Sequence, residues 1–297
     1  MKNVPRDSEP LTAIKSKNFS IRFFQNLLEV TILKKISINQ NILKNYLCQY
    51  KLFKQSYKMN LYNLIIQDKE EVTLNDVFLE PKNKEQFVQL IKEQTYAKEL
   101  QEYGLPVNNK ILLEGSSGCG KTMTAKAIAN ALGKNIIILN LSNIVSSRIG
   151  ETSQNIKMIF DKASRERSVL FLDELDQIGK ARGSDDKDVG EMRRLVNTLI
   201  QLIDYYPENA LLLCATNHPE IIDTALIRRF QLKINYEMPS KEFLDTFYDN
   251  LLSKFPQDLR NIERKYEISF AEAKDYTFTI VKGNLIKNLE AKHQTQS

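Results

Sequence analysis

The stretch GSSGCGKT, at Gly115–Thr122, decides the fold of this 297-residue chain. It matches the pattern G-x-x-x-x-G-K-[ST], in which glycines let the backbone bend so that successive N–H groups point into the loop. The apolar run Ile111–Leu113 precedes the stretch and a helical pattern follows it, so a strand, a tight loop and a helix are expected in this order. Such a loop holds phosphate groups at a helix N-terminus. A glycine turn without a ligand is the alternative, and the strand–loop–helix setting argues against it.

The residues of this loop predict how a nucleotide is bound. Lys121 is expected to reach the β- and γ-phosphates, and the hydroxyl of Thr122 is expected to bind Mg²⁺. The N-terminus of the following helix adds its partial positive charge. The predicted nucleotide-binding residues of the loop are Gly115, Ser116, Ser117, Gly118, Cys119, Gly120, Lys121, Thr122 and Met123.

Short β-rich runs alternate with helical patterns around the loop. This alternation predicts an α/β fold, in which helices cover both faces of a parallel sheet. One helix is expected over 84–102, before Gly104 and Pro106, and a helical C-terminal segment starts near Phe243. The expected strands lie at Ile111–Leu113, Ile136–Leu141, Val169–Leu172, Leu211–Ala215 and Leu232–Ile234.

A second apolar run ends in two carboxylates. In SVLFLDELD, at Ser168–Asp176, the buried strand Val169–Leu172 is expected to deliver Asp173 beside the metal. Glu174 follows at once and is expected to orient and deprotonate the water that attacks the γ-phosphate. Acidic residues often end strands, so the pair alone is a weak signal. Downstream of a phosphate loop it predicts hydrolysis, and it argues against a small-molecule kinase, which must exclude water.

Further polar groups follow a strand and a helix. LLLCATNHPE, at Leu211–Glu220, contains a strand that ends before Asn217, whose amide is expected to donate to phosphate and accept from the attacking water. His218 is interpreted as a structural neighbour. DTALIRRF presents Arg228 and Arg229 at a helix end, where guanidinium groups also complement the helix dipole. Taken alone, this last stretch favours the dipole interpretation.

In this order and spacing, the phosphate loop, LFLDELD, ATN and ALIRRF closely resemble the AAA family of ATPases. The resemblance runs from about Leu74 to the C-terminus. Within it, Gly190–Asp204 resembles the helix that follows the metal strand and lies near the subunit interface. It implies an αβα nucleotide-binding domain with a small helical lid, the cofactors ATP and Mg²⁺, and a homo-oligomer, usually a hexameric ring. It also implies an enzyme that turns ATP hydrolysis into conformational work on a macromolecule.

The same resemblance gives roles to single residues. Asn217 is the sensor, and Arg228 and Arg229 are arginine fingers that enter the neighbouring subunit's site, where guanidinium meets the charge developing on the γ-phosphoryl group. Val77, in NDVFLEP, corresponds to an aliphatic residue that packs near adenine. No arginine follows Arg264 in the sequence, so no second sensor arginine is assigned. The predicted catalytic residues are Lys121, Glu174, Asn217, Arg228 and Arg229, and the predicted metal ligands are Thr122 and Asp173.

Changes in pattern along the chain predict three parts. A basic helical region spans residues 1–72, with amphipathic helices near 21–36 and 42–57. The nucleotide-binding domain spans 73–238, and the helical lid spans 239–297.

The net charge of +5 is unevenly distributed. Residues 1–70 hold twelve Lys and Arg against five Asp and Glu, so any surface for a polyanion or an acidic partner is expected near the N-terminus. A solvated basic helix face is the plainer interpretation. Nucleic acid stays open as a partner, although no recognition-helix motif indicates it.

Composition argues against several other classes of protein. No apolar run approaches the roughly 20 residues of a membrane helix, and the N-terminus lacks the apolar segment of a signal peptide. Cys48, Cys119 and Cys214 are scattered and odd in number, and with only His218 and His293 they predict neither disulfides nor a zinc site. Reduced thiols suit the cytoplasm, so a cytoplasmic protein without a membrane partner is expected.

The stretch SSRIGETSQ, at Ser146–Gln154, is expected to place Arg148, Ile149 and Gly150 in a loop, followed by a helix start. It bears on the kind of work done. Members of the AAA family that thread peptide carry an aromatic–aliphatic–glycine step here, facing the central pore. In this chain Arg148 replaces the aromatic residue, while Ile149 and Gly150 keep the rest. Arginine offers charge-assisted hydrogen bonds and a flat stacking face in place of an apolar grip. A solvent-facing arginine with no client contact is the alternative.

The leading hypothesis is thus a ring ATPase that remodels or disassembles a protein partner of unknown identity. A nucleotide-controlled binding switch and a DNA-directed regulatory ATPase with slow turnover stay open as alternatives.

Overall fold

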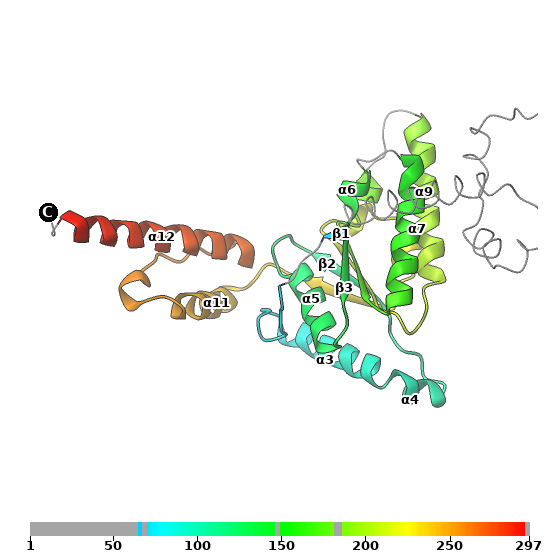
Figure 1. Ribbon diagram of the computed structural model, residues 1–297, viewed down its shortest axis with the longest axis horizontal. Helices are drawn as coiled ribbons and strands as arrows, with labels where there is room; N and C mark the ends of the chain where they lie inside the picture. Colours follow the sequence, from blue (N-terminus) through cyan, green and yellow to red (C-terminus); the bar gives the residue numbers. More distant parts are fainter. Residues whose placement is uncertain (1–64, 67–69, 146–148, 181–185, 295–297) are drawn as a thin grey trace, which may run out of the picture. The chain divides into compact units, whose positions relative to one another are not determined.

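The computed structural model describes residues 65–66, 70–145, 149–180 and 186–294 (Figure 1). The predicted helices near 21–36 and 42–57, and Arg148, lie outside the described residues. The elements of the first half are β1 (Ile65–Ile66), α3 (Pro81–Thr95), α4 (Ala97–Glu102), β2 (Lys110–Gly115), α5 (Lys121–Ala131), β3 (Ile136–Asn140), α6 (Leu141–Val145) and α7 (Ile149–Glu166). Those that follow are β4 (Val169–Asp173), α8 (Gln177–Lys180), α9 (Asp186–Asp204), β5 (Leu212–Thr216), η1 (Pro219–Ile221), α10 (Thr224–Ile227), β6 (Leu232–Tyr236), α11 (Lys241–Ser253), η2 (Gln257–Leu259) and α12 (Phe270–Gln294).

The described strands form one six-stranded sheet in the order β1-β3-β4-β5-β2-β6. All neighbours pair in parallel except β1, which runs antiparallel to β3 at one edge. The predicted α/β fold with a parallel sheet is confirmed, and each of the five expected strands is present. β1 was not expected, because two residues leave no alternation to detect. The carboxyl ends of β2, β4 and β5 meet at one edge of the sheet, and this edge carries the predicted site residues.

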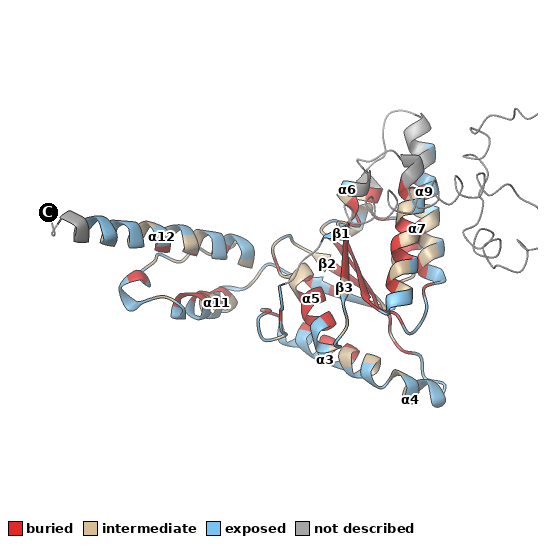
Figure 2. Ribbon diagram, in the orientation of Figure 1, coloured by how far each residue is buried: buried red, intermediate tan, exposed pale blue. Residues whose placement is uncertain are grey.

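Helices cover both faces of the sheet, α7 and α9 on one and α3 and α5 on the other (Figure 1). Side chains alternate along each central strand: Leu112 packs with the α7–α9 layer, whereas Ile111 and Leu113 pack with the α3–α5 layer. The same alternation along β4 and β5 leaves their apolar side chains almost without exposure, as the buried strands of Figure 2 show. Burial on both faces explains why these strands are apolar throughout.

The helices depart from the sequence prediction in two places. The helix expected over 84–102 is broken at Tyr96, the residue between α3 and α4. Helix α7 begins at Ile149, so Ile149 and Gly150 belong to the helix and not to the loop before it. The expected helix over Gly190–Asp204 is present as the larger part of α9.

The C-terminal residues form a separate cluster. Buried and half-buried apolar side chains of α11 and α12, with Tyr248 the largest of those fully buried, pack together and apart from the two clusters that cover the sheet. Ser240 caps α11 by accepting from the N–H of Phe243, and Ser269 lies immediately before α12, where it exchanges hydrogen bonds with Glu272.

The three predicted parts stay predictions, and β1 lies within the first of them. Among the described residues, no helix combines the length and the apolar character needed to cross a membrane.

Candidate nucleotide site

Two glycines allow close approaches in the phosphate loop. A Cβ at Gly115, which ends β2, would lie 2.0 Å from the carbonyl oxygen of Tyr236 on β6. Gly118 has a φ of 74°, and a Cβ there would lie 2.5 Å from Oγ of Ser269. Only glycine suits such positions. The loop then enters α5 through Gly120, whose backbone is left-handed. These features give a backbone cradle at a helix N-terminus, the form that binds phosphate.

Lys121 lies buried at the start of α5. Its Nζ donates to the carbonyl oxygens of Gly115 at 2.7 Å and Ser116 at 2.8 Å, and to Oδ1 of Asn217 at 2.7 Å. Burial lowers the pKa of Lys121, and the nearby carboxylate of Asp173 is one of the charges that oppose this shift. All three acceptors are neutral oxygens, and charged phosphate oxygens accept more strongly. The ammonium is therefore held in the loop by partners that phosphate can replace.

The two predicted metal ligands lie side by side. Oγ1 of Thr122 donates to Oδ2 of Asp173 at 3.1 Å. Burial raises the pKa of Asp173, although the hydrogen bond from Thr122 opposes the shift. Hydroxyl and carboxylate oxygens suit Mg²⁺, which takes one or two carboxylates and completes its shell with phosphates and water. Within the described ranges no group of three or more His, Cys, Asp and Glu side chains converges as a metal site. The donor set fits Mg²⁺ held jointly with a nucleotide.

Glu174 has an unusual backbone. Its φ is 58°, in the left-handed region that non-glycine residues rarely adopt, and its N–H donates to Oδ1 of Asp173 at 3.0 Å. Such conformations cost about 1–3 kcal/mol and cluster at functional sites. The chain continues into buried Leu175, whose N–H donates to the carbonyl oxygen of Ala215 at 2.9 Å on β5. Glu174 is thus fixed between the end of β4 and a contact with β5.

Asp176 is a buried residue of the site that has no predicted role from the sequence. It is 1% exposed, and its Oδ1 accepts from Oγ1 of Thr216 at 3.1 Å and from the N–H of Asn217 at 3.2 Å. Its position three residues after Asp173, beyond the carboxyl end of a buried strand, is the signal that could have found it. From the sequence alone, a third acidic residue after a strand is interpreted as part of a solvated loop. Only the strand order shows which groups lie next to it.

Val77, which is expected near the base, and the predicted loop residues Cys119 and Met123 are buried or partly buried at the loop. Val77 is buried, and its Cγ1 is 3.6 Å from the position that a Cβ on Gly120 would take. Cys119 is buried as well, and burial raises the pKa of its thiol. Met123 is partly buried against the same apolar cluster. A small hollow beside Cys119 is lined by several aromatic side chains: Phe78, Tyr236, Phe243 and Phe270.

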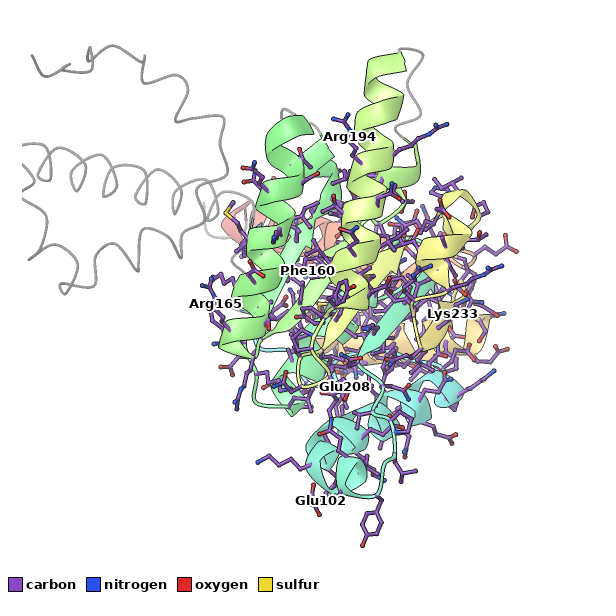
Figure 3. The ribbon with its side chains drawn as sticks, turned by 90° about the vertical axis from the view of Figure 1, so that its right-hand side faces the viewer. Glu102, Phe160, Arg165, Arg194, Glu208 and Lys233 are labelled. Carbon is purple, nitrogen blue, oxygen red and sulfur yellow. The ribbon has the colours of Figure 1, made fainter. Side chains whose placement is uncertain are left out.

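The two arginines differ in their surroundings. Nε of Arg229 donates to Oδ1 of Asp204 at 3.2 Å, and its Nη1 donates to the carbonyl oxygen of Ala225 at 2.6 Å. Arg228 follows the last residue of α10, is exposed, and has no side-chain partner among the described residues. No contact joins either side chain to the phosphate loop within the described part of the chain. Arg194, exposed on α9 in Figure 3, is a further surface cation.

The start of α12 touches the loop. The N–H of Ala271 donates to the carbonyl oxygen of Gly118 at 3.2 Å, next to the tight approach of Ser269. The ring of Phe78 contacts those of Phe247 and Phe270, with centroids 5.0 Å and 5.7 Å apart. The segment before α3 and the C-terminal helices therefore meet beside the site.

Comparison with known sequences agrees with this geometry. Residues 111–238 match the family model described as "ATPase family associated with various cellular activities (AAA)". A relative named as the uncharacterized AAA family ATPase y4kL, from Sinorhizobium fredii (strain NBRC 101917 / NGR234), is 32% identical over 216 residues. This alignment covers 72% of the chain and 65% of the relative's length.

Proposed function

Because residues 111–238 form an AAA family ATPase domain, we propose that the chain binds ATP with Mg²⁺ and hydrolyses it. The observation that carries this proposal is the meeting of three segments at one edge of the sheet. There, Lys121 of the phosphate loop contacts Asn217 after β5, and Thr122 contacts Asp173 of β4. Binding alone would need the loop, whereas Glu174 next to Asp173 adds a group that hydrolysis needs.

Each side chain has a task in this proposal. Lys121 exchanges its neutral acceptors for β- and γ-phosphate oxygens, and Thr122 and Asp173 hold Mg²⁺, which neutralises charge on the phosphates. Asn217 donates to the γ-phosphate and accepts from the attacking water. Glu174 takes the proton of that water, aided by its fixed backbone. The loop residues from Gly115 to Met123 surround the phosphates, and Val77 lies near the base.

We propose further that the active form is a homo-oligomer, with a hexameric ring as the expected size. Charge that develops on the γ-phosphoryl group needs a cation in addition to Lys121. Arg228 is exposed and has no partner among the described residues, which supports its insertion into a neighbouring subunit's site. Arg229 has the same predicted role. It must leave Asp204 of its own subunit to reach a neighbour, and a half-exposed pair of this kind is worth only about 0–1 kcal/mol.

The work done by hydrolysis is proposed to be the remodelling or disassembly of a protein partner. The contacts between the start of α12 and Gly118 support this step, because a nucleotide that reshapes the loop also moves α12. Such movement is a two-state element that hydrolysis can bias.

The test is steady-state ATPase activity of the purified full-length chain, with Mg²⁺ and with EDTA. Activity should require Mg²⁺, and Glu174→Gln should reduce kcat roughly 100- to 10,000-fold with ATP binding retained. Turnover unchanged in Glu174→Gln would refute the proposed base. Affinity capture with the Glu174→Gln protein in ATP, compared with the same protein in ADP, then identifies the partner held in the ATP state.

A further inference from the structure

The end of β5 is held by a carboxylate that no proposed step uses. Oδ1 of Asp176 accepts from both the hydroxyl of Thr216 and the N–H of Asn217, at 3.1 Å and 3.2 Å. Its Oδ2 lies 3.4 Å from Nε2 of Gln177, the first residue of α8. Asp176 is 1% exposed and Thr216 is also 1% exposed, so these bonds are shielded from water. Shielded hydrogen bonds to a charged acceptor are about twice as strong as neutral ones.

These bonds complete a closed path through the site. Asp176 holds the backbone of Asn217, whose Oδ1 accepts from Nζ of Lys121. Thr122 adjoins Lys121 and donates to Asp173, which precedes Asp176 by three residues. The path therefore returns to its start and includes the groups proposed to bind phosphate, metal and water.

The path also bears on Glu174. This residue lies between Asp173, which accepts from its N–H, and Leu175, whose N–H donates to Ala215. Asp176 makes the next contact to β5, so both sides of the left-handed turn at Glu174 are attached to the sheet. A strained turn persists only where its surroundings fix it.

We propose that Asp176 is a positioning residue for hydrolysis, which holds the side-chain amide of Asn217 against Lys121 and the γ-phosphate. The inference rests on the proposed function. Asp176 touches Thr216 and the backbone of Asn217, and it acts on the reaction only through its neighbours. Small displacements of such groups cost up to about 100-fold in rate.

A merely structural role makes a different prediction. If Asp176 only joined the ends of β4 and β5, its loss would lower stability, and any effect on kcat would be independent of Asn217. A positioning role predicts instead that the effect of Asp176 on kcat disappears when the amide of Asn217 is absent. The double-mutant cycle between these two residues separates the cases.

The experiment measures kcat, KM, the Kd for ADP and the midpoint of thermal unfolding in the full-length chain. Asp176→Ala is expected to lower kcat roughly 10- to 100-fold with little change in the Kd for ADP. Asp176→Asn keeps an oxygen for Thr216 and Asn217, so it should recover most of kcat. In an Asn217→Ala background, Asp176→Ala should cost less than about twofold more. Tyr248→Phe, which removes the hydrogen bond at 2.9 Å to Lys265 in the C-terminal cluster, is the matched control and should leave kcat unchanged.

Losses that multiply in the double variant, or an unchanged kcat in Asp176→Ala, would overturn the inference. Should Asp176→Ala fail to fold, Thr216→Val replaces it, because it keeps the side-chain shape and removes the bond to Asp176, together with the bond that the Thr216 hydroxyl accepts from the N–H of His218. Its smaller loss of kcat should likewise vanish in the Asn217→Ala background, and no loss would overturn the inference. A wild-type chain without Mg²⁺-dependent turnover would contradict the proposed function itself. Turnover that Glu174→Gln abolishes and Asp176→Ala leaves intact would contradict only the role of Asp176.

Discussion

Among single residues, the partly buried Asp173 is expected to lower the stability of the chain at neutral pH. Burial raises the pKa of its carboxyl above the ordinary value of 3.8, so the ionised form is less favourable in the folded than in the unfolded chain. The stabilisation from a protonated Asp173 is complete below the unfolded pKa and is lost as pH rises through the folded pKa. At neutral pH the ionised carboxylate therefore lowers the free energy of unfolding. This loss of stability would accompany the proposed role of Asp173 as a metal ligand.

Asp173→Asn is accordingly expected to raise the free energy of unfolding at pH 7 in EDTA while abolishing Mg²⁺-dependent hydrolysis. The gain should shrink as pH falls toward 3.8, because wild-type Asp173 then becomes neutral as well. Urea unfolding at several pH values measures both effects. Asp245→Asn is the opposite control: the hydrogen bond from Arg264 lowers the pKa of Asp245, so its removal should decrease stability at pH 7. A lower stability of Asp173→Asn at pH 7 would contradict the account.

The adjacent arginines should differ in the size of their effects. Arg228→Ala is expected to reduce kcat roughly 1,000-fold or more, the usual contribution of an arginine finger, with ATP binding retained. Arg229→Ala should cost less, because Arg229 also pairs with Asp204 and Ala225 of its own subunit. Asp204→Asn removes the ion pair between Arg229 and Asp204, and its kcat serves as the comparison for Arg229→Ala. Equal kcat in wild type and Arg228→Ala would show that Arg228 takes no part in the reaction.

At the scale of elements, apolar runs predicted the strands better than periodicity predicted the helices. Strands buried on both faces are uninterrupted apolar runs, so β2, β4 and β5 were evident. The helix break at Tyr96 could not be predicted, because neither Gly nor Pro occupies that position. Helix α7 likewise starts at Ile149, although the polar, glycine-containing sequence there suggested a loop.

The site was predictable where chemistry follows a strand end directly. Gly115–Thr122, Asp173 and Asn217 come at such ends, and strand order alone brings them together. Asp176 was not predictable in the same way, because its partners Thr216 and Asn217 are 40 and 41 residues away along the chain. Only the pairing of β4 with β5 makes them neighbours.

The capping of α12 gives a prediction for that element. Ser269→Ala removes the hydroxyl that bonds Glu272, and should lower the free energy of unfolding by about 1 kcal/mol. It should also change the Kd for ADP, because Ser269 lies against Gly118 of the phosphate loop. Ser240→Ala, at the start of α11, is the matched control: a similar loss of stability is expected with an unchanged Kd. Identical Kd values in both variants would show that α12 and the loop are independent.

For the whole molecule, the proposed finger from a neighbouring subunit would make activity depend on assembly. Turnover per subunit should rise with protein concentration until oligomers are complete, because on this proposal a lone subunit lacks the guanidinium that completes its site. ATPase assays across a concentration series, with light scattering to follow oligomer mass, measure this. Constant turnover per subunit in a range where mass changes would contradict a shared site.

The most direct test of the central claim mixes two inactive variants. Glu174→Gln keeps Arg228 but cannot activate water, and Arg228→Ala keeps Glu174 but cannot complete a neighbour's site. Each alone should be nearly inactive. If the site is an ATPase centre completed in trans, a mixture regains activity wherever an Arg228→Ala subunit receives the finger of a Glu174→Gln subunit. ATP turnover that peaks at intermediate mixing ratios is the predicted result, and turnover that never exceeds that of either variant alone, in oligomers shown to exchange subunits, would contradict the claim.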